Sequence, residues 1–482
     1  MLEELKEIDN IYDLMALCGM VVLRLDKEQP YDFSAFRDGL YEDLYDAVEE
    51  YCFAKEDRGS GKAFAELKKY IIGFLKNDIS IERCFAVMKC IDELVAVEYP
   101  CCLLESQRVI SYPCMNKRFC EEIRIIPKNR RNFFIKKEAE MKERNRSEYD
   151  FLRKERECKC TVLDGEIINY IIWDKENIEK YPFTVYYLSE KHFITKHFIE
   201  TEKLTFAIIP FIDEKLEDVF EVNLENKIFE ISKMKPAMEQ KLKERYQEIY
   251  QKCKEKNIDF LIFPEMLMTE YIVNAAERSK DFGSPWLVIN GSMWKERVNR
   301  TWFMDSRGEK ILTYCKKEPF IYKETYKEHL DRTKNQEYAI LEIENFGRIG
   351  IAICKDLVNE KIKMFHKYIG TNLLFVPAYT ESMDLQSAAG ELSRDYKCIV
   401  IVANACSAIK KSNKHDKKER IGFISLPAKN NSDRTEGIIT YYQDGCRKGC
   451  CDYCGGKLIS IIFDRENAFE FGTSYMIEKS SF

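Results

Sequence analysis

The sequence lacks several features that would place it in a specialised class of protein. No apolar run approaches the roughly 18 residues that a membrane-spanning helix requires, so we expect no membrane partner. The first ten residues, MLEELKEIDN, are acidic and do not follow the basic and then apolar plan of a secretory signal. Histidine occurs only five times, and low-complexity tracts are absent. These absences argue against membrane, secreted and disordered proteins.

Cysteine, in contrast, is abundant. The chain has 19 cysteines, an odd number, and they are scattered along the sequence. Two of them, Cys84 and Cys90, fall within an apolar helical pattern, which is unlike a disulfide framework. Free thiols in a reducing compartment account for this usage, and we therefore predict a cytoplasmic protein.

Length and charge limit the alternatives further. A chain of 482 residues exceeds one ordinary hydrophobic core, which predicts at least two domains. The formal net charge is −6, and charged residues make up 33% of the chain with both signs mixed. The whole chain therefore has no overall attraction to nucleic acid.

Composition and periodicity divide the chain into three parts. Residues 1–125 are predicted to form a helical N-terminal domain, and residues 126–202 a charged linker with short strands. Within this linker, residues 128–159 hold twelve Lys or Arg against seven Asp or Glu, with aromatic residues interleaved. Such a segment suits contact with nucleic acid. A solvated helix crossed by ion pairs is the simpler interpretation.

Residues 203–482 alternate between apolar strand patterns and amphipathic helical patterns, which is typical of an α/β layered domain. Three of the predicted strands end on reactive groups: the carboxylate of Glu265, the ammonium of Lys316 and the thiol of Cys354. Cys354 alone has a simpler interpretation as a buried structural thiol, because free cysteine is among the most buried residue types. The small residues Gly350 and Ala352 lie on the same strand face as Cys354 and are interpreted as room for close packing beneath a reactive centre.

Residues 203–465 resemble the nitrilase, or carbon–nitrogen hydrolase, superfamily. Five segments resemble its motifs in the right order: FLIFPE, VNRTWFMDSRGEKILTYCKK, FGRIGIAICKD, LLFVPAY and SRDYKCIVIVANA. The resemblance implies an α-β-β-α sandwich, here preceded by a mainly helical N-terminal domain. It also implies a catalytic triad of Glu265, Lys316 and Cys354, with the Tyr-x-Lys spacing favouring Lys316 over the adjacent Lys317. A homodimer or larger homo-oligomer, and no cofactor for catalysis, are further implications.

The chemistry of these groups fits such roles. A thiol with a pKa of about 8.5 needs a base or a positive field to react at neutral pH. Glu265 would take the thiol proton and return it to the leaving amine. Lys316 would stabilise the thiolate and the oxyanion, with the backbone N–H of Lys355 as a second donor.

The resemblance also implies a substrate-positioning glutamate between the lysine and the cysteine. It is Glu328 or Glu324, and the distance from the following strand favours Glu328. Two departures from the family pattern are the residue at position 355 and the length of one link. Lys355 stands where the family more often has an aromatic residue, so we expect it to influence substrate positioning. The link between AIIPF and the Glu265 strand is longer than typical.

A cysteine cluster near the C-terminus predicts a structural zinc site, with free thiols in a loop as the alternative. The cluster comprises Cys446, Cys450, Cys451 and Cys454. The Cys-x-x-Cys-Gly piece resembles a zinc knuckle, in which a tight turn brings two thiolates to one ion. A distant Cys158 and Cys160 pair would be another way to complete four ligands.

These observations favour a thiol-dependent hydrolase of a small non-peptide amide, with an amide preferred over a nitrile. One alternative is a papain-like protease, for which His366 is poorly placed. Another is a regulatory protein, of the kind used in bacterial defence. Its nitrilase-like domain would mediate oligomerisation, and its N-terminal region would bind a protein or nucleic-acid partner.

Overall fold

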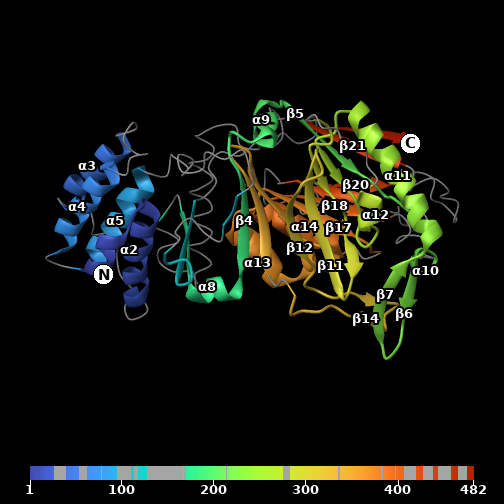
Figure 1. Ribbon diagram of the computed structural model, residues 1–482, viewed down its shortest axis with the longest axis horizontal. Helices are drawn as coiled ribbons and strands as arrows, with labels where there is room; N and C mark the ends of the chain where they lie inside the picture. Colours follow the sequence, from blue (N-terminus) through green and yellow to red (C-terminus); the bar gives the residue numbers. More distant parts are fainter. Residues whose placement is uncertain are drawn as a thin grey trace. The chain divides into compact units, whose positions relative to one another are not determined.

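The computed structural model describes most of the chain, and the structural statements below concern these residues. They are 1–26, 40–53, 62–76, 79–94, 110–112, 118–127, 167, 170–212, 214–274, 283–334, 337–380, 384–396, 398–405, 420–426, 438–442, 457–464 and 475–481. The chain forms two compact units (Figure 1). One comprises residues 1–131 and 135–185, and the other residues 132–134 and 186–482. The predicted boundaries after residues 125 and 202 stay predictions.

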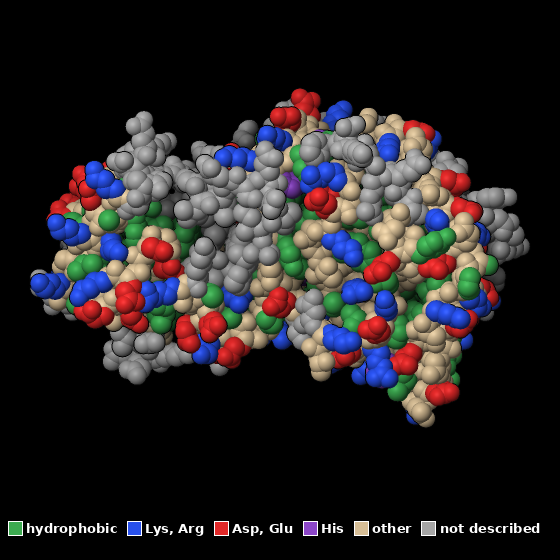
Figure 2. All heavy atoms as spheres, viewed as in Figure 1, with side chains coloured by type: hydrophobic (Ala, Val, Ile, Leu, Met, Phe, Trp, Pro, Cys, Tyr) green, Lys and Arg blue, Asp and Glu red, His purple; other side chains and the backbone are tan. Residues whose placement is uncertain are grey.

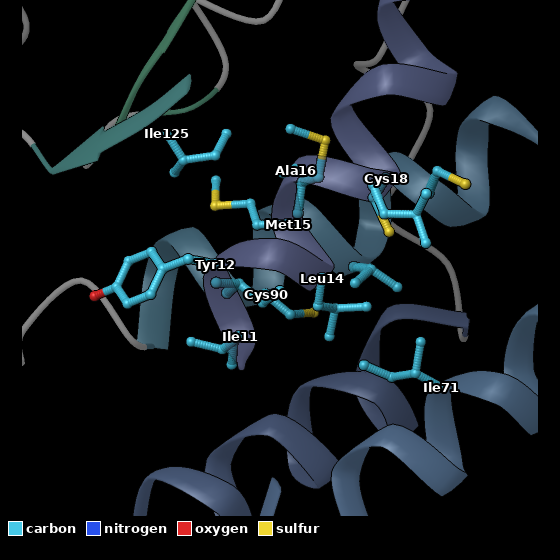
Figure 3. Close-up of a cluster of buried hydrophobic side chains, with 14 of the residues drawn as sticks. Ile11, Tyr12, Leu14, Met15, Ala16, Cys18, Ile71, Cys90 and Ile125 are labelled. Carbon is cyan, nitrogen blue, oxygen red and sulfur yellow. The ribbon is translucent and has the colours of Figure 1, made fainter. Parts of the chain in front are cut away.

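The N-terminal unit is mainly helical. Its elements are α1 (Leu2–Glu7), α2 (Ile11–Asp26), α3 (Leu40–Phe53), α4 (Lys62–Lys76), α5 (Ile81–Leu94), α8 (Lys175–Lys180), β1 (Ile110–Tyr112), β2 (Ile123–Pro127) and β3 (Tyr170–Asp174). Leu14 and Cys18 of α2 share one apolar cluster with Ile71 of α4 and Cys90 of α5 (Figure 3). Ile125 of β2 joins it. The helical spacing read from the sequence therefore reflects burial of one face of each helix.

The C-terminal unit contains most of the strands. Its helices are α9 (Phe193–Glu200), α10 (Leu216–Val219), α11 (Pro236–Glu255), α12 (Glu270–Val273), α13 (Glu360–Tyr368) and α14 (Asp384–Tyr396). Its strands are β4 (Phe183–Leu188, from residue 186 on), β5 (Lys203–Ile208), β6 (Phe220–Asn223), β7 (Ile228–Met234), β8 (Phe260–Ile262), β9 (Leu287–Ile289), β10 (Met293–Lys295), β11 (Val298–Asp305), β12 (Lys310–Cys315), β13 (Ile321–Tyr322), β14 (Tyr326–Glu328), β15 (Tyr338–Ile343), β16 (Gly347–Ile351), β17 (Leu373–Ala378), β18 (Ile399–Asn404), β19 (Arg420–Ser425), β20 (Ile438–Tyr442), β21 (Lys457–Asp464) and β22 (Tyr475–Ser481).

Two large sheets pack face to face in this unit. One has the order β4-β15-β16-β17-β18-β19-β20, and the other the order β10-β11-β9-β8-β5-β21-β22 with β12 paired to β11. The centres of both are parallel, through β16-β17-β18 and β5-β8-β9. Phe375 of β17 lies between the two sheets. Its ring centroid is 5.5 Å from that of Phe260 on β8 and 6.1 Å from that of Phe303 on β11.

Helices cover the outer face of each sheet. Ala207 and Leu261 follow the inward-facing aromatic residues of β5 and β8, so they point to the opposite face, where they join the apolar side of α11. On the other sheet, the ring of Phe365 in α13 stacks 4.1 Å from that of Tyr338 in β15. The unit is an α-β-β-α sandwich, as predicted.

The strand that leads to Cys354 is shorter than the sequence pattern predicts. β16 ends at Ile351, and Cys354 opens a 3-10 turn that runs to Val358. The space beside Gly350 is filled by the ring of His366 and the methyl group of Thr371. Close packing at Gly350 is therefore confirmed, against His366 of α13 and against Thr371 beyond the end of that helix. Its predicted place beneath a reactive centre stays a prediction.

A third, smaller sheet was not predicted. Its order is β13-β14-β7-β6. Strands β6 and β7 lie in the long link between β5 and β8, which the sequence marked as unusual.

Charges of both signs are interspersed on the face of the molecule shown in Figure 2. No helix among the described residues is long and apolar enough to cross a membrane.

The packing at Gly350 predicts a large effect of one methyl group. In Gly350→Ala, the added Cβ would lie 2.7 Å from Cε1 and 2.8 Å from Nδ1 of His366. We expect the free energy of unfolding of the full chain to fall by about 1–3 kcal/mol, the usual range for an overpacked core. Urea denaturation measures it. Gly283→Ala is the control, because nothing lies within 4 Å of its added Cβ, and an equal loss in both variants would contradict the packing account.

Candidate active site

Glu265, Lys316 and Cys354 lie in one buried cluster. Glu265 follows β8, Lys316 follows β12 of the same sheet, and Cys354 follows β16 of the facing sheet. The backbone N–H of Glu265 donates to the carbonyl of Ala378 at the end of β17, at 3.3 Å, which joins the two sheets here. Strand ends at the carboxyl edge of parallel sheets are the usual place for reactive side chains in α/β folds.

The ammonium of Lys316 is the centre of this cluster. Its Nζ lies 2.6 Å from Oε1 of Glu265 and 2.7 Å from Oε2 of Glu328. The side-chain amide of Asn299 donates to both carboxylates, at 2.9 Å to Glu265 and 3.2 Å to Glu328. The side chains of Lys316 and Glu328 are fully buried. One ammonium thus neutralises part of the charge of two desolvated carboxylates, which would otherwise be costly to bury.

The structure separates the alternatives that the sequence left open. Glu328 is buried in the cluster, whereas Glu324 is exposed in the turn between β13 and β14. Lys317 points elsewhere, because its Nζ donates to the carbonyl of Glu337 at 3.0 Å. Lys316 and Glu328 are therefore the lysine and second glutamate that meet Glu265.

Cys354 occupies an unusual backbone position. Its φ is +48°, in the left-handed region that residues other than glycine rarely adopt. Met266, directly after Glu265, has a φ of +69° and donates its N–H to Oγ of Ser292 at 2.8 Å. Strained backbone of this kind concentrates at functional sites, where surrounding contacts hold it. Both sharp turns bring their reactive side chains into the same buried space.

Burial dominates the electrostatics of the site. It raises the pKa of the Cys354 thiol well above its usual value, the charge of Glu265 adds to this, and Lys316 opposes it. Burial also raises the pKa of Glu265. The charge of Lys316 opposes this rise, and the charge of Glu328 adds to it. For Lys316, burial alone would lower the pKa, but Glu265 and Glu328 outweigh it and raise the pKa. The resting site therefore holds a protonated thiol beside a carboxyl group and a charged ammonium.

Asp356 links the cysteine turn to the lysine segment. Its Oδ1 accepts the backbone N–H groups of Lys317 and Glu318, at 3.0 and 2.8 Å. Its Oδ2 accepts the N–H of Ile353 at 3.2 Å and the hydroxyl of Tyr314 at 2.9 Å. Burial raises the pKa of Asp356 to about 6 against the influence of Lys316 and these hydrogen bonds. One carboxyl group thus fixes the backbone on both sides of the cluster.

Two other predicted residues have side chains outside the buried cluster. Lys355 follows Cys354 in the same turn, but its side chain is exposed, whereas those of Glu265, Lys316 and Cys354 are buried. His366 is buried, its pKa is lowered to about 3 by burial, and its Nδ1 lies 3.0 Å from Oγ1 of Thr371. That position beside Gly350 gives no support to a papain-like pairing with Cys354.

The predicted zinc ligands lie outside the described residues. They are Cys446, Cys450, Cys451 and Cys454, with the alternative pair Cys158 and Cys160. Within the part of the chain that the structure describes, no group of three or more His, Cys, Asp or Glu side chains is arranged to hold a metal ion. The zinc site stays a prediction.

Three residues of the site received no role from the sequence: Asn299, Asp356 and Phe320. Asn299 and Asp356 lie within segments that resemble family motifs, and this position was the sequence feature that could have identified them as site residues. Phe320 lies 4.8 Å from the Lys316 ammonium, measured to its ring centroid, and donates its N–H to Oε2 of Glu328 at 3.2 Å. No motif marked it.

Comparison with solved structures finds distant likenesses. A glutamine-dependent NAD+ synthetase from Acinetobacter baumannii is 14% identical with a TM-score of 0.36, over 58% of this chain and 48% of that chain. Nit3 from Saccharomyces cerevisiae, a member of branch 10 of the nitrilase superfamily, is 12% identical with a TM-score of 0.34, over 50% and 87%. An amidase from Nesterenkonia sp. AN1 is 11% identical with a TM-score of 0.30, over 46% and 85%.

This chain thus spans about half the length of the synthetase. No protein-family model matches the chain, and no curated protein matches its sequence. Likenesses of this size say nothing about the reaction, and the chemistry proposed below rests on the geometry of the cluster.

The shared ammonium predicts a pH-dependent loss of stability in Lys316→Met. Without the cation that lowers it, the pKa of Glu265 would rise further above its unfolded value. The folded state would then bind more protons, so its stability would fall as pH rises. We expect a loss of about 3–5 kcal/mol at pH 8, as for a broken buried pair, and a smaller loss at pH 5. Denaturant titration of the full chain at both pH values measures it.

Lys310→Met on β12 is the matched control, because Lys310 is exposed and lies over the Trp302 ring. We expect it to change the free energy of unfolding by less than about 0.5 kcal/mol. A Lys316→Met loss that did not depend on pH would contradict the electrostatic role of Lys316.

Proposed function

We propose that the C-terminal unit hydrolyses a carbon–nitrogen bond of a small amide through a thioester on Cys354. The observation that carries this proposal is the buried cluster in which a thiol, two carboxylates and one shared ammonium meet. A structural ion pair would not need a cysteine in a left-handed turn beside it. This combination supplies a nucleophile, a base and a fixed positive charge, which are the parts that acyl transfer requires.

The raised pKa of Cys354 determines the order of events. Because the resting thiol is protonated, Glu265 takes its proton as Sγ attacks the carbonyl carbon of the substrate. The carbonyl oxygen becomes an oxyanion, which Lys316 and the backbone N–H of Lys355 stabilise. Glu265 then gives its proton to the leaving nitrogen, the C–N bond breaks, and ammonia or an amine departs.

The second half of the cycle uses the same groups in reverse. Glu265, again a carboxylate, removes a proton from water as the water oxygen attacks the thioester carbonyl. Collapse of the second tetrahedral intermediate breaks the C–S bond, and the proton returns to sulfur. The products are a carboxylic acid and the free thiol, so no redox partner is required.

We propose an amide rather than a nitrile as the substrate. The buried carboxyl group of Glu265 accepts a hydrogen bond from the Cys354 thiol. In the mechanism above Glu265 passes that proton to a leaving nitrogen, and an amide has such a nitrogen on a C–N single bond, whereas a nitrile has none. Glu328 adds a second carboxylate that orients the amide while holding Lys316 in place.

The proposal predicts that Cys354 and Glu265 are both essential for ammonia release. We expect Cys354→Ala to abolish turnover of a panel of small amides. It should also remove the peptide carrying Cys354 from those alkylated by iodoacetamide. Glu265→Gln should lower turnover by about 10²–10⁴-fold, the usual contribution of general acid–base catalysis. Ammonia release and peptide mapping after alkylation are the measurements.

Glu324→Gln is the matched control, because Glu324 is exposed near the same segment, and we expect it to keep wild-type turnover. Ammonia release that survived Cys354→Ala would exclude the thioester route.

A further inference from the structure

We infer that Phe229, on the hairpin β6–β7, is a positioning residue that holds Glu328 and the aromatic ring beside Lys316. This inference rests on the proposed function and adds a positioning residue outside the cluster. The hairpin occupies the long link before the Glu265 strand, which the family resemblance left without a purpose. Figure 1 shows β6, β7 and β14 lying together at one end of the C-terminal unit.

The hairpin is built by local interactions. β6 and β7 pair antiparallel, with Val222 opposite Ile231. Asn226 and Lys227 in its turn have φ values of +51° and +60°. Two successive left-handed residues give the tight turn whose twist matches that of paired strands. The hairpin therefore presents β7 as a formed edge to which another strand can pair.

β14, which carries Glu328, depends on that edge. β14 has three residues and its antiparallel partner β13 has two, which is too short for independent stability. β7 adds a parallel partner, with Glu328 opposite Phe229. The N–H of Lys327 donates to the carbonyl of Lys227 at 2.9 Å, and the N–H of His329 donates to the carbonyl of Phe229 at 3.1 Å. The backbone on both sides of Glu328 is thus fixed by the hairpin.

The side chain of Phe229 supports the same site from a second direction. It is fully buried, and its ring centroid lies 5.0 Å from those of both Phe320 and Tyr322. Phe320 is the ring beside the Lys316 ammonium, and its N–H holds Oε2 of Glu328. Phe229 therefore packs against Phe320, the residue that lies beside the lysine and holds the glutamate.

A shift of Glu328 has a measurable electrostatic consequence. The groups that act on the pKa of Glu265 are Lys316, Glu328 and Cys354, besides burial, and the charge of Glu328 raises it. If Glu328 moves away, the pKa of Glu265 falls. Because Glu265 is the proposed base for Cys354, the reaction rate of the Cys354 thiol rises with pH as Glu265 loses its proton. This rising part of the pH profile, the acid limb, then moves to lower pH.

Phe229→Ala tests the inference. We expect kcat/KM for an amide to fall about 10- to 100-fold, since misplacement by about 1 Å can cost 10²-fold. The acid limb of Cys354 alkylation by iodoacetamide should move to lower pH, in the same direction as in Glu328→Gln. Phe229→Leu, which keeps most of the apolar volume, should recover most of the activity and the original limb.

Ile231→Ala is the matched control, because Ile231 is buried on β7 two residues further on and has no register partner in β14. We expect kcat/KM within about threefold of the wild type and an unmoved acid limb. Thermal unfolding of each full-length variant confirms that it is folded.

The outcomes separate the two proposals. If Phe229→Ala and Phe229→Leu leave both kcat/KM and the acid limb unchanged, the hairpin is only structural and the inference is wrong. If both Phe229 variants and Ile231→Ala lose activity equally with no movement of the limb, the inference is also wrong. If the wild-type chain releases no ammonia from any amide, the proposed function fails. The acid limb of Cys354 alkylation by iodoacetamide, which can be measured without any turnover, then tests the inference alone.

Discussion

The site depends on one interaction, the sharing of the Lys316 ammonium between the carboxylates of Glu265 and Glu328. All three groups are removed from water, so each carboxylate is tolerable only while the cation is in place. The cation in turn requires both carboxylates, because burial alone would favour its neutral form. Cys354 lies against this group, and in the proposed reaction Glu265 of the group is its base.

Separate parts of the fold deliver these groups. One sheet supplies Glu265 and Lys316, the facing sheet supplies Cys354, and the small sheet supplies Glu328. Asp356 joins the backbone of the cysteine turn to that of the lysine segment. The small sheet is joined instead through Phe229 and Phe320. The geometry of the site is therefore set by contacts between layers, and the side chains of the cluster are held by their neighbours.

An α/β layered domain with reactive groups at three strand ends was accessible from the sequence, because buried strands have continuous apolar patterns and their ends are marked by charge. The sandwich and the meeting of Glu265, Lys316 and Cys354 were expected only from the resemblance to a family. The small sheet was not accessible, since β13 and β14 are too short to show a period and β7 alternates weakly. Asn299 acts through side-chain geometry that no spacing reveals. The predicted end of β16 was wrong, because the apolar run continues through Ile353 although the strand ends at Ile351. At Ile353 the backbone N–H already donates to Asp356, in the turn that follows the strand.

A trapping experiment tests the central claim, that the amide passes through a thioester on Cys354, most directly. In the presence of hydroxylamine, a thioester partitions between water and the added nucleophile. The account predicts that a hydroxamate forms from the amide, rises with hydroxylamine concentration at the expense of the acid, and disappears in Cys354→Ala. Formation of acid alone at every hydroxylamine concentration, as direct attack by water on the amide would give, would contradict it.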